Sequence, residues 1–191
     1  MDCTAICVIP TERSVQNMKN LSTQKLVVAG LLGAVCIVMG MTGLGMIPAP
    51  TPSGRATIMH IPVILAGILE GPLVGGLTGL IFGVYSFLTP TGVIPADPIV
   101  RILPRILIGL TSAWTFRALY KHRSFAAAMA GIVGTVTNTL GFLGLAVLIG
   151  YLPAKTLVLF IPQFFAELLI ATVLVVILTK ALARFIQIKE S

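Results

Sequence analysis

The sequence predicts an all-α integral membrane protein with six transmembrane helices and both termini in the cytoplasm. Hydrophobic residues make up 57% of the 191 residues and charged residues only 10%, and the mean hydropathy is +1.03, far outside the balance of a water-soluble domain. Charges divide the chain into apolar segments close to the roughly 20 residues that cross a bilayer. Basic residues gather on one side of these segments, which sets the orientation.

The six predicted segments cover residues 26–47, 56–69, 71–96, 98–116, 124–154 and 156–179. The second segment is short for a span and contains His60, and the third ends in the turn-rich run TPTGVIPADP. The fourth segment carries Arg101 and Arg105, and Glu167 interrupts the sixth. We expect residues 1–20 to form a disordered cytoplasmic leader and residues 21–191 to form a single six-helix transmembrane domain.

The distribution of basic residues places both termini in the cytoplasm. Nine of the 13 Lys and Arg residues lie before the first segment, between the fourth and fifth, or after the sixth: Arg13, Lys19, Lys25, Arg117, Lys121, Arg123, Lys180, Arg184 and Lys189. Only Arg55 and Lys155 fall in the opposite loops. The positive-inside rule explains the net charge of +7, so nucleic-acid binding is not needed to account for it.

Six polar side chains interrupt the predicted spans at similar depths. They are His60, Arg101, Arg105, Asn138, Gln163 and Glu167. With a rise of about 1.5 Å per residue, all of them fall in the outer half of the bilayer. An ionisable residue in a membrane segment is a candidate functional residue, because leaving it in lipid costs a few kcal/mol.

Two pairs among these six residues have the four-residue spacing that places side chains on one face of a helix. Arg101 and Arg105 are four residues apart, and so are Gln163 and Glu167. We expect the two polar stripes to face a cavity that is open to the exterior and closed below. Arg105 and Glu167 could also form a structural ion pair, but one carboxylate cannot neutralise two arginines. One arginine is therefore expected to bind an anion.

Loops and small residues complete the predicted arrangement. The Pro- and Gly-containing runs IPAPTPSGRAT and TPTGVIPADP cannot be helical and are expected to cap the cavity as a pair of gates. Glycines recur every four residues at Gly75, Gly79 and Gly83, which predicts close helix packing within the protein. On the first segment, the pairs Ala29/Gly33 and Gly30/Ala34 give a small-residue face that could receive another subunit.

The run TGLGMIPAPTPSGRATIMHIPVILAGILEGPLVGGLTGLIFGVYSFL, followed by PRILIGL, resembles the substrate-binding S components of energy-coupling factor (ECF) vitamin transporters. The resemblance covers about residues 25–185 and is strongest over residues 42–110. It implies a six-helix bundle that binds a vitamin from outside and associates with a transmembrane T subunit and two cytoplasmic ATPases, in a prokaryotic plasma membrane. The family's small-residue motif on the first helix contacts the T subunit, which implies Ala29/Gly33 or Gly30/Ala34 here.

Among S components, the HIPVI run, the arginine of the fourth segment and the asparagine of the fifth are most similar to the pantothenate-specific branch. This resemblance implies that Arg101 or Arg105 binds the vitamin carboxylate, that Asn138 and Gln163 bond its amide and hydroxyl groups, and that His60 lines the entrance. Folate, riboflavin, cobalamin or another vitamin is the alternative ligand. A stand-alone secondary transporter is the alternative function.

Other classes of function are disfavoured by missing motifs. The sequence contains neither HExxH nor GxxxxGK[ST], so we expect no enzyme activity and no bound cofactor, with ATP used by partner subunits. Cys3 and Cys7 lack further nearby ligands, so no metal site is expected.

Overall fold

The computed structural model describes residues 23–48, 55–90 and 94–190, with side chains as far as residue 182 except at residues 47, 48, 55 and 56. The predicted leader at residues 1–20 lies outside the described residues, as do parts of both expected capping loops. The elements are α2 (Thr23–Met41), β1 (Met46–Pro48), β2 (Arg55–Thr57), α3 (Ile61–Glu70), α4 (Pro72–Leu88), α5 (Pro98–Ala118), α6 (Arg123–Leu148), η2 (Ala154–Phe160) and α7 (Ile161–Glu190).

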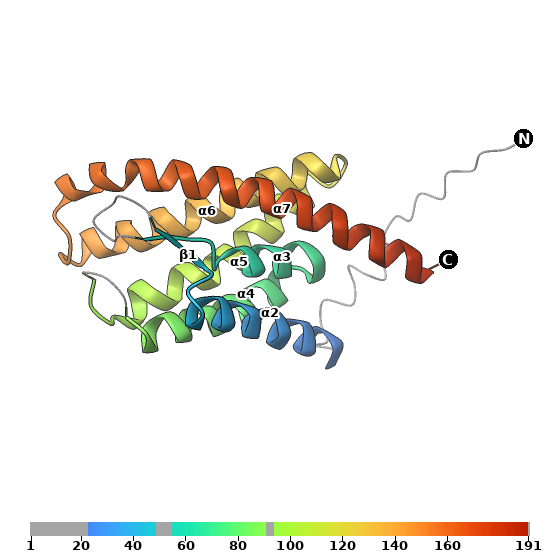
Figure 1. Ribbon diagram of the computed structural model, residues 1–191, viewed down its shortest axis with the longest axis horizontal. Coiled ribbons are helices and arrows are strands. Elements are labelled where there is room, and N and C mark those ends of the chain that lie inside the picture. Colours follow the sequence, from blue (N-terminus) through green and yellow to red (C-terminus); the bar gives the residue numbers. More distant parts are fainter. Residues whose placement is uncertain (1–22, 49–54, 91–93, 191) are drawn as a thin grey trace, which may run out of the picture.

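These elements form an elongated helical bundle (Figure 1). The β-hairpin and the α4–α5 and α6–α7 connections gather at one end, which we call the hairpin end, and the end of α7 lies at the other. Among the described residues, four stretches are long and apolar enough to cross a membrane: α2, α5, α6, and Ala154–Leu182. Helices α3 and α4 are also apolar but shorter, at 10 and 17 residues.

The helices differ from the predicted segments mainly at the hairpin end. Helix α2 ends at Met41, and the chain after it turns into β1, which pairs antiparallel with β2 in the register Met46↔Thr57. The all-helical expectation is thus confirmed except for this hairpin. The sixth segment begins as the 3₁₀ helix η2, and α7 starts only at Ile161, with Pro162 in its first turn.

Local sequence signals explain where the shorter helices start and stop. Gly71 adopts φ of 99°, which favours glycine, and lets α3 turn directly into α4, which begins at Pro72. At the hairpin end, the Asp97 carboxylate caps α5 by accepting bonds from the N–H groups of Ile99 (2.8 Å) and Val100 (3.4 Å). Tyr151 donates to the same carboxylate at 2.9 Å, which lowers the pKa of Asp97 below its ordinary value.

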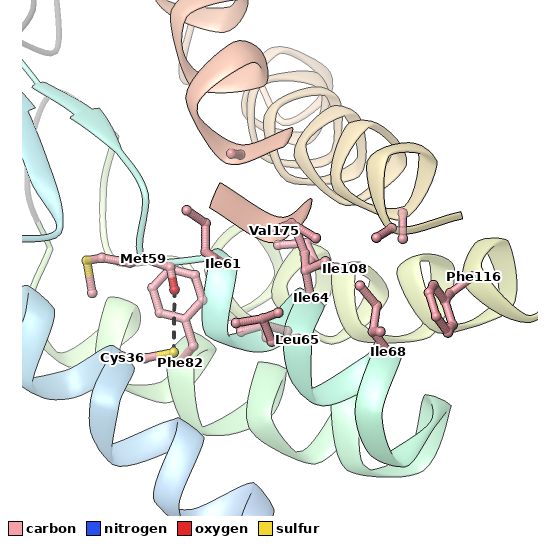
Figure 2. Packing of buried hydrophobic residues seen from close by; sticks show 14 of the residues in the cluster. Cys36, Met59, Ile61, Ile64, Leu65, Ile68, Phe82, Ile108, Phe116 and Val175 are labelled. Atoms are coloured by element: carbon pink, nitrogen blue, oxygen red, sulfur yellow. Dashed lines mark hydrogen bonds between the residues drawn. The ribbon is translucent and has the colours of Figure 1, made fainter. Parts of the chain in front are cut away.

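Helix α3 occupies the centre of the bundle. All residues from Ile61 to Ile68 are buried, and α3 packs against α2, α4, α5, α6 and α7. Figure 2 shows this core, where Ile64 and Leu65 lie among side chains of the surrounding helices. The Cys36 thiol of α2 donates to the Met59 carbonyl at 3.4 Å, at the start of the α3 region. A 10-residue helix is therefore stabilised by being buried on every side.

Helices α4 and α5 approach each other backbone to backbone. A Cβ atom on Gly75 would lie 2.7 Å from the Gly109 carbonyl oxygen, and one on Gly83 would lie 2.9 Å from the Cα of Ile102. A Cβ on Gly79 would meet the carbonyl of Arg105. The prediction that these glycines pack within the protein is confirmed. The contact also sets the position of α5, the helix that carries both buried arginines.

We predict that Gly109→Ala destabilises the protein by about 1–3 kcal/mol, because the new methyl group meets the backbone of Gly75 and Gly76. The thermal unfolding midpoint of the detergent-solubilised protein measures this effect. Gly144→Ala is the matched control, because a Cβ atom there meets nothing within 4 Å and alanine favours the helix. Equal midpoints for the two variants would contradict the close contact between α4 and α5.

Candidate functional site

A cavity of about 430 Å³ opens at the hairpin end of the bundle. Its wall combines β1 and β2, the last turns of α4, the first half of α5, the second half of α6, and the η2–α7 junction. Five of the six predicted polar residues line it: Arg101, Arg105, Asn138, Gln163 and Glu167. Five aromatic side chains also line it: Phe82, Tyr85, Phe142, Phe160 and Phe164. The size and the mixture of apolar and polar groups fit a small-molecule site.

Arg101 is held by the backbone of the α4–α5 connection. Its Nη1 donates to the Ser86 carbonyl at 3.1 Å, its Nη2 to the Ile94 carbonyl at 2.6 Å, and its Nε to the Pro95 carbonyl at 3.1 Å. These acceptors are aligned with the planar guanidinium, which has five N–H donors in a fixed fork. Arg101 therefore secures a loop at the rim of the cavity, and most of its hydrogen-bonding capacity is used within the protein.

Arg105 has far fewer partners than Arg101. Its Nη1 donates to the Val100 carbonyl at 3.3 Å, and its Nε is buried without a hydrogen-bond partner. The guanidinium lies 4.5 Å from the ring centroid of Phe142 and 5.7 Å from that of Phe82, within the range of cation–π attraction. Only 6% of the residue is exposed. Of the two arginines, Arg105 has more donor capacity left for a ligand, with one of its five N–H groups bonded against three for Arg101.

Pro104 explains why the Val100 carbonyl can accept this bond. A proline inside a helix has no N–H, so the carbonyl four residues earlier loses its helical partner. Here that carbonyl belongs to Val100, and the Arg105 side chain takes the place of the missing donor. The Arg105 side chain thus turns back toward Val100 while lining the cavity.

Glu167 connects α7 to the β-hairpin. Its Oε1 accepts bonds from the backbone N–H of Thr57 at 2.6 Å and from Nε2 of Gln163 at 2.9 Å. In the part of the chain that the structure describes, no nitrogen–oxygen pair within 4.0 Å joins Glu167 to Arg105. The alternative of a direct structural ion pair between these two residues is therefore wrong for this structure.

Two further polar atoms at the cavity wall are buried without partners. They are Oδ1 of Asn138 and Oγ1 of Thr139, on neighbouring residues of α6. Buried acceptors and hydroxyls are usually bonded, because desolvating them without a partner costs about 1–3 kcal/mol each. Like Nε of Arg105, they are enclosed polar atoms without a partner, on residues that line the cavity.

The structure places His60 away from its expected position at the entrance. The side chain is fully buried and is not part of the cavity wall, and its Nε2 lies 3.0 Å from Oγ1 of Thr135 on α6. Its position just before α3, the most buried helix, explains the difference. His60 follows Met59, which does line the cavity, and its own ring is packed into the core between α3 and α6.

The small residues of α2 divide into an inward and an outward pair. Ala29 and Gly33 are buried, and a Cβ on Gly33 would lie 2.8 Å from the Ile81 side chain of α4. Gly30 and Ala34 are exposed, and a Cβ on Gly30 would meet nothing within 4 Å. Of the two pairs, Gly30/Ala34 therefore lies on the exposed face of α2 and Ala29/Gly33 on the buried face.

Sequence reasoning missed several residues that shape the cavity. Thr57 contributes its backbone N–H, which no pattern of side chains predicts. Pro104 has no N–H, and this leaves the Val100 carbonyl free to accept a bond from Arg105. The signal for Pro104 was present, because a proline between two arginines in an apolar helix frees a carbonyl beside them. The lining aromatics lie on α4, α6, η2 and α7 and share no periodic pattern.

The cavity is suited to binding an anion. Its wall presents a buried guanidinium with a free donor, and guanidinium–carboxylate bonds are among the strongest hydrogen bonds in proteins. The described residues contain no group of three or more His, Cys, Asp or Glu side chains that could hold a metal ion. Cys3 and Cys7 lie outside the described residues.

Comparisons with known proteins find two relatives of similar sequence. The chain is 29% identical over 105 residues to the pantothenic acid transporter of Lactococcus lactis, covering 44% of this chain and 53% of that protein, about half its length. It is 28% identical over 154 residues to the pantothenate transporter of Leuconostoc mesenteroides, covering 73% of this chain and 75% of that protein.

The fold is also similar to a solved structure. The S component of a bacterial ECF transporter superposes with a TM-score of 0.61 at 23% identity, covering 85% of this chain and 97% of the other. A family model described as the substrate-specific component of ECF transporters matches residues 24–187. The chain therefore belongs to the family of ECF transporter S components, which are substrate-binding subunits of transporters and not enzymes.

Proposed function

We propose that this chain binds pantothenate in the membrane and delivers it to a T subunit and a pair of ATPases, as the S component of an ECF-type importer. The proposal draws on the relatives named as pantothenate transporters and on one observation at the cavity. That observation is Arg105, a buried cation with an unpartnered Nε and no ion pair to Glu167 among the described residues. Such a group needs an anion, which the carboxylate of pantothenate supplies.

The other polar groups of the cavity suit the remainder of the ligand. Pantothenate has an amide and two hydroxyl groups besides its carboxylate, and its gem-dimethyl group is apolar. We assign Asn138 and Gln163 to the amide and hydroxyl groups and the aromatic wall to the apolar part. Arg101 holds the neighbouring loop, and His60 contributes to the packing beneath the cavity. The chain itself binds no cofactor in this proposal, and ATP is used by the partner subunits.

The proposed orientation has six crossings with both termini in the cytoplasm of a prokaryotic cell. The short helices α3 and α4 then cross as a hairpin, in which α3 is buried among the other helices and α4 keeps an exposed apolar face. Arg117 in the last turn of α5, Lys121 in the connection and Arg123 at the start of α6 fall at the end opposite the cavity, as the positive-inside rule requires of the cytoplasmic side. The cavity then faces the exterior, from which the vitamin enters.

The proposed contact with the T subunit is the exposed face of α2. Gly30 and Ala34 lie there between exposed apolar side chains, including Val27, Leu31 and Val38. Small residues among larger apolar ones allow a second transmembrane helix to approach closely. Ala29 and Gly33 are already used by the contact with α3 and α4.

A direct test is to screen the purified full-length chain against water-soluble vitamins by thermal shift and calorimetry. We expect pantothenate to bind with 1:1 stoichiometry and without chemical change, and folate, riboflavin and cobalamin to bind far more weakly. Strong binding of one of these instead of pantothenate would contradict the assigned ligand. Uptake by this chain alone in liposomes under an ion gradient would support a stand-alone transporter and contradict the S-component role.

We predict that Arg105→Ala weakens pantothenate binding by about 1.5–3 kcal/mol, because it removes a hydrogen bond to a charged group. This loss corresponds to a Kd increase of roughly 10- to 150-fold, which calorimetry on the detergent-solubilised protein resolves. Arg123→Ala is the control, because its guanidinium bonds Tyr120 outside the cavity. A variant Arg105→Ala that folds and binds like the wild type would disprove the assignment.

We predict that Ala34→Leu reduces co-purification with the T subunit and the ATPases, because the larger side chain prevents close approach of another helix. Pantothenate affinity of the isolated chain is expected to stay unchanged, since Ala34 is exposed on α2. Gly144→Leu serves as a control at an open position on α6. Full assembly of the complex with Ala34→Leu would exclude this face of α2 as the contact.

A further inference from the structure

The charged side chains of the cavity limit the charge of its ligand. Within the described lining, Arg101 and Arg105 are cationic and Glu167 is the one carboxylate, which leaves one net positive charge. Burying an uncompensated charge is costly, so the ligand that best fills this cavity brings one negative charge. A ligand with two carboxylates would leave the site with a net negative charge.

Glu167 has one oxygen committed to the protein and one available. Both of its hydrogen bonds, from Thr57 N–H and from Nε2 of Gln163, go to Oε1. Among the described residues, none donates to Oε2. The side chain is only 2% exposed and lines the cavity. A carboxylate is acceptor-only, so Oε2 can be satisfied there only by water or by a donor on the ligand.

The cation and the free acceptor lie on different walls. Arg105 belongs to α5 and Glu167 to α7, and these helices are each packed against α6 and α3. Phe142, which lies 4.5 Å below the Arg105 guanidinium, and Phe164 of α7 supply apolar wall in the same cavity. A ligand whose carboxylate sits at Arg105 can therefore present a different group to Glu167 on α7.

We infer that Glu167 determines specificity: its Oε2 accepts a hydrogen bond from a hydroxyl or amide N–H at the end of the ligand remote from the single anionic group. This inference rests on the proposed function, in which Arg105 binds the carboxylate. It defines the ligand class as a monoanion with an apolar middle and a donor at its far end. Ligands with two carboxylates, or with only acceptors at that end, are rejected.

The experiment combines a protein variant with ligand analogues. Pantothenate and analogues in which each hydroxyl in turn is a methyl ether are titrated into the purified full-length wild type and Glu167→Gln. The glutamine keeps an oxygen that accepts from Thr57 N–H, but an NH₂ donor replaces the Oε2 acceptor that is available to the ligand. Glu70→Gln, the same change at the end of α3 outside the cavity wall, is the matched control.

For one of the two hydroxyl groups, we expect the wild type and Glu70→Gln to bind pantothenate about tenfold or more tightly than the corresponding methyl ether. Glu167→Gln is expected to lose or invert this preference, because its amide can donate to the ether oxygen. An unchanged preference in a folded Glu167→Gln protein overturns the inference.

The wild type alone also tests the inference if the variant does not fold. Ethers that all bind the wild type within twofold of pantothenate overturn it without any substitution. No binding of pantothenate itself overturns the proposed function, whereas binding with no hydroxyl preference overturns only the role of Glu167.

Discussion

Arg105 places a cation inside an apolar bundle without a counter-charge in contact, and the arrangement around the cavity follows from that burial. Taking such a group out of water costs several kcal/mol unless the surroundings compensate. The protein supplies partial compensation: the carbonyl freed by Pro104 accepts one bond, the Phe142 ring lies 4.5 Å away, and Glu167 of α7 lines the same cavity. Nε still has no partner. An anionic ligand supplies the counter-charge that Arg105 lacks.

The other charged groups gain their roles from the same constraint. Arg101, one helical turn away, is bonded by carbonyls of Ser86, Ile94 and Pro95 and so stabilises a connection at the rim. Glu167 joins the β-hairpin to α7 through Thr57 N–H. Both residues bond backbone atoms, so the cavity is assembled before any ligand enters. The glycine contact between α4 and α5 holds the arginine-bearing helix in place behind them.

Helical periodicity and charge placement were sufficient to predict the helices, the glycine packing of α4 and a polar cavity with five of its lining residues. Spacing alone could not separate Arg101 from Arg105, because residues four apart share a face and the loop carbonyls that distinguish them are distant in sequence. The expectation that His60 lines the entrance is wrong for a related reason, because the side of the chain that faces the cavity depends on how α3 packs. The hairpin register arises from tertiary pairing that the Pro-rich sequence does not reveal.

The most direct test of the central claim is an experimentally determined structure of the protein with its anionic ligand bound. The account predicts ligand carboxylate oxygens about 2.7–2.9 Å from the Arg105 guanidinium. Arg101 should remain on its three loop carbonyls in that structure. A carboxylate bound to Arg101, with Arg105 paired to Glu167 instead, would contradict the account.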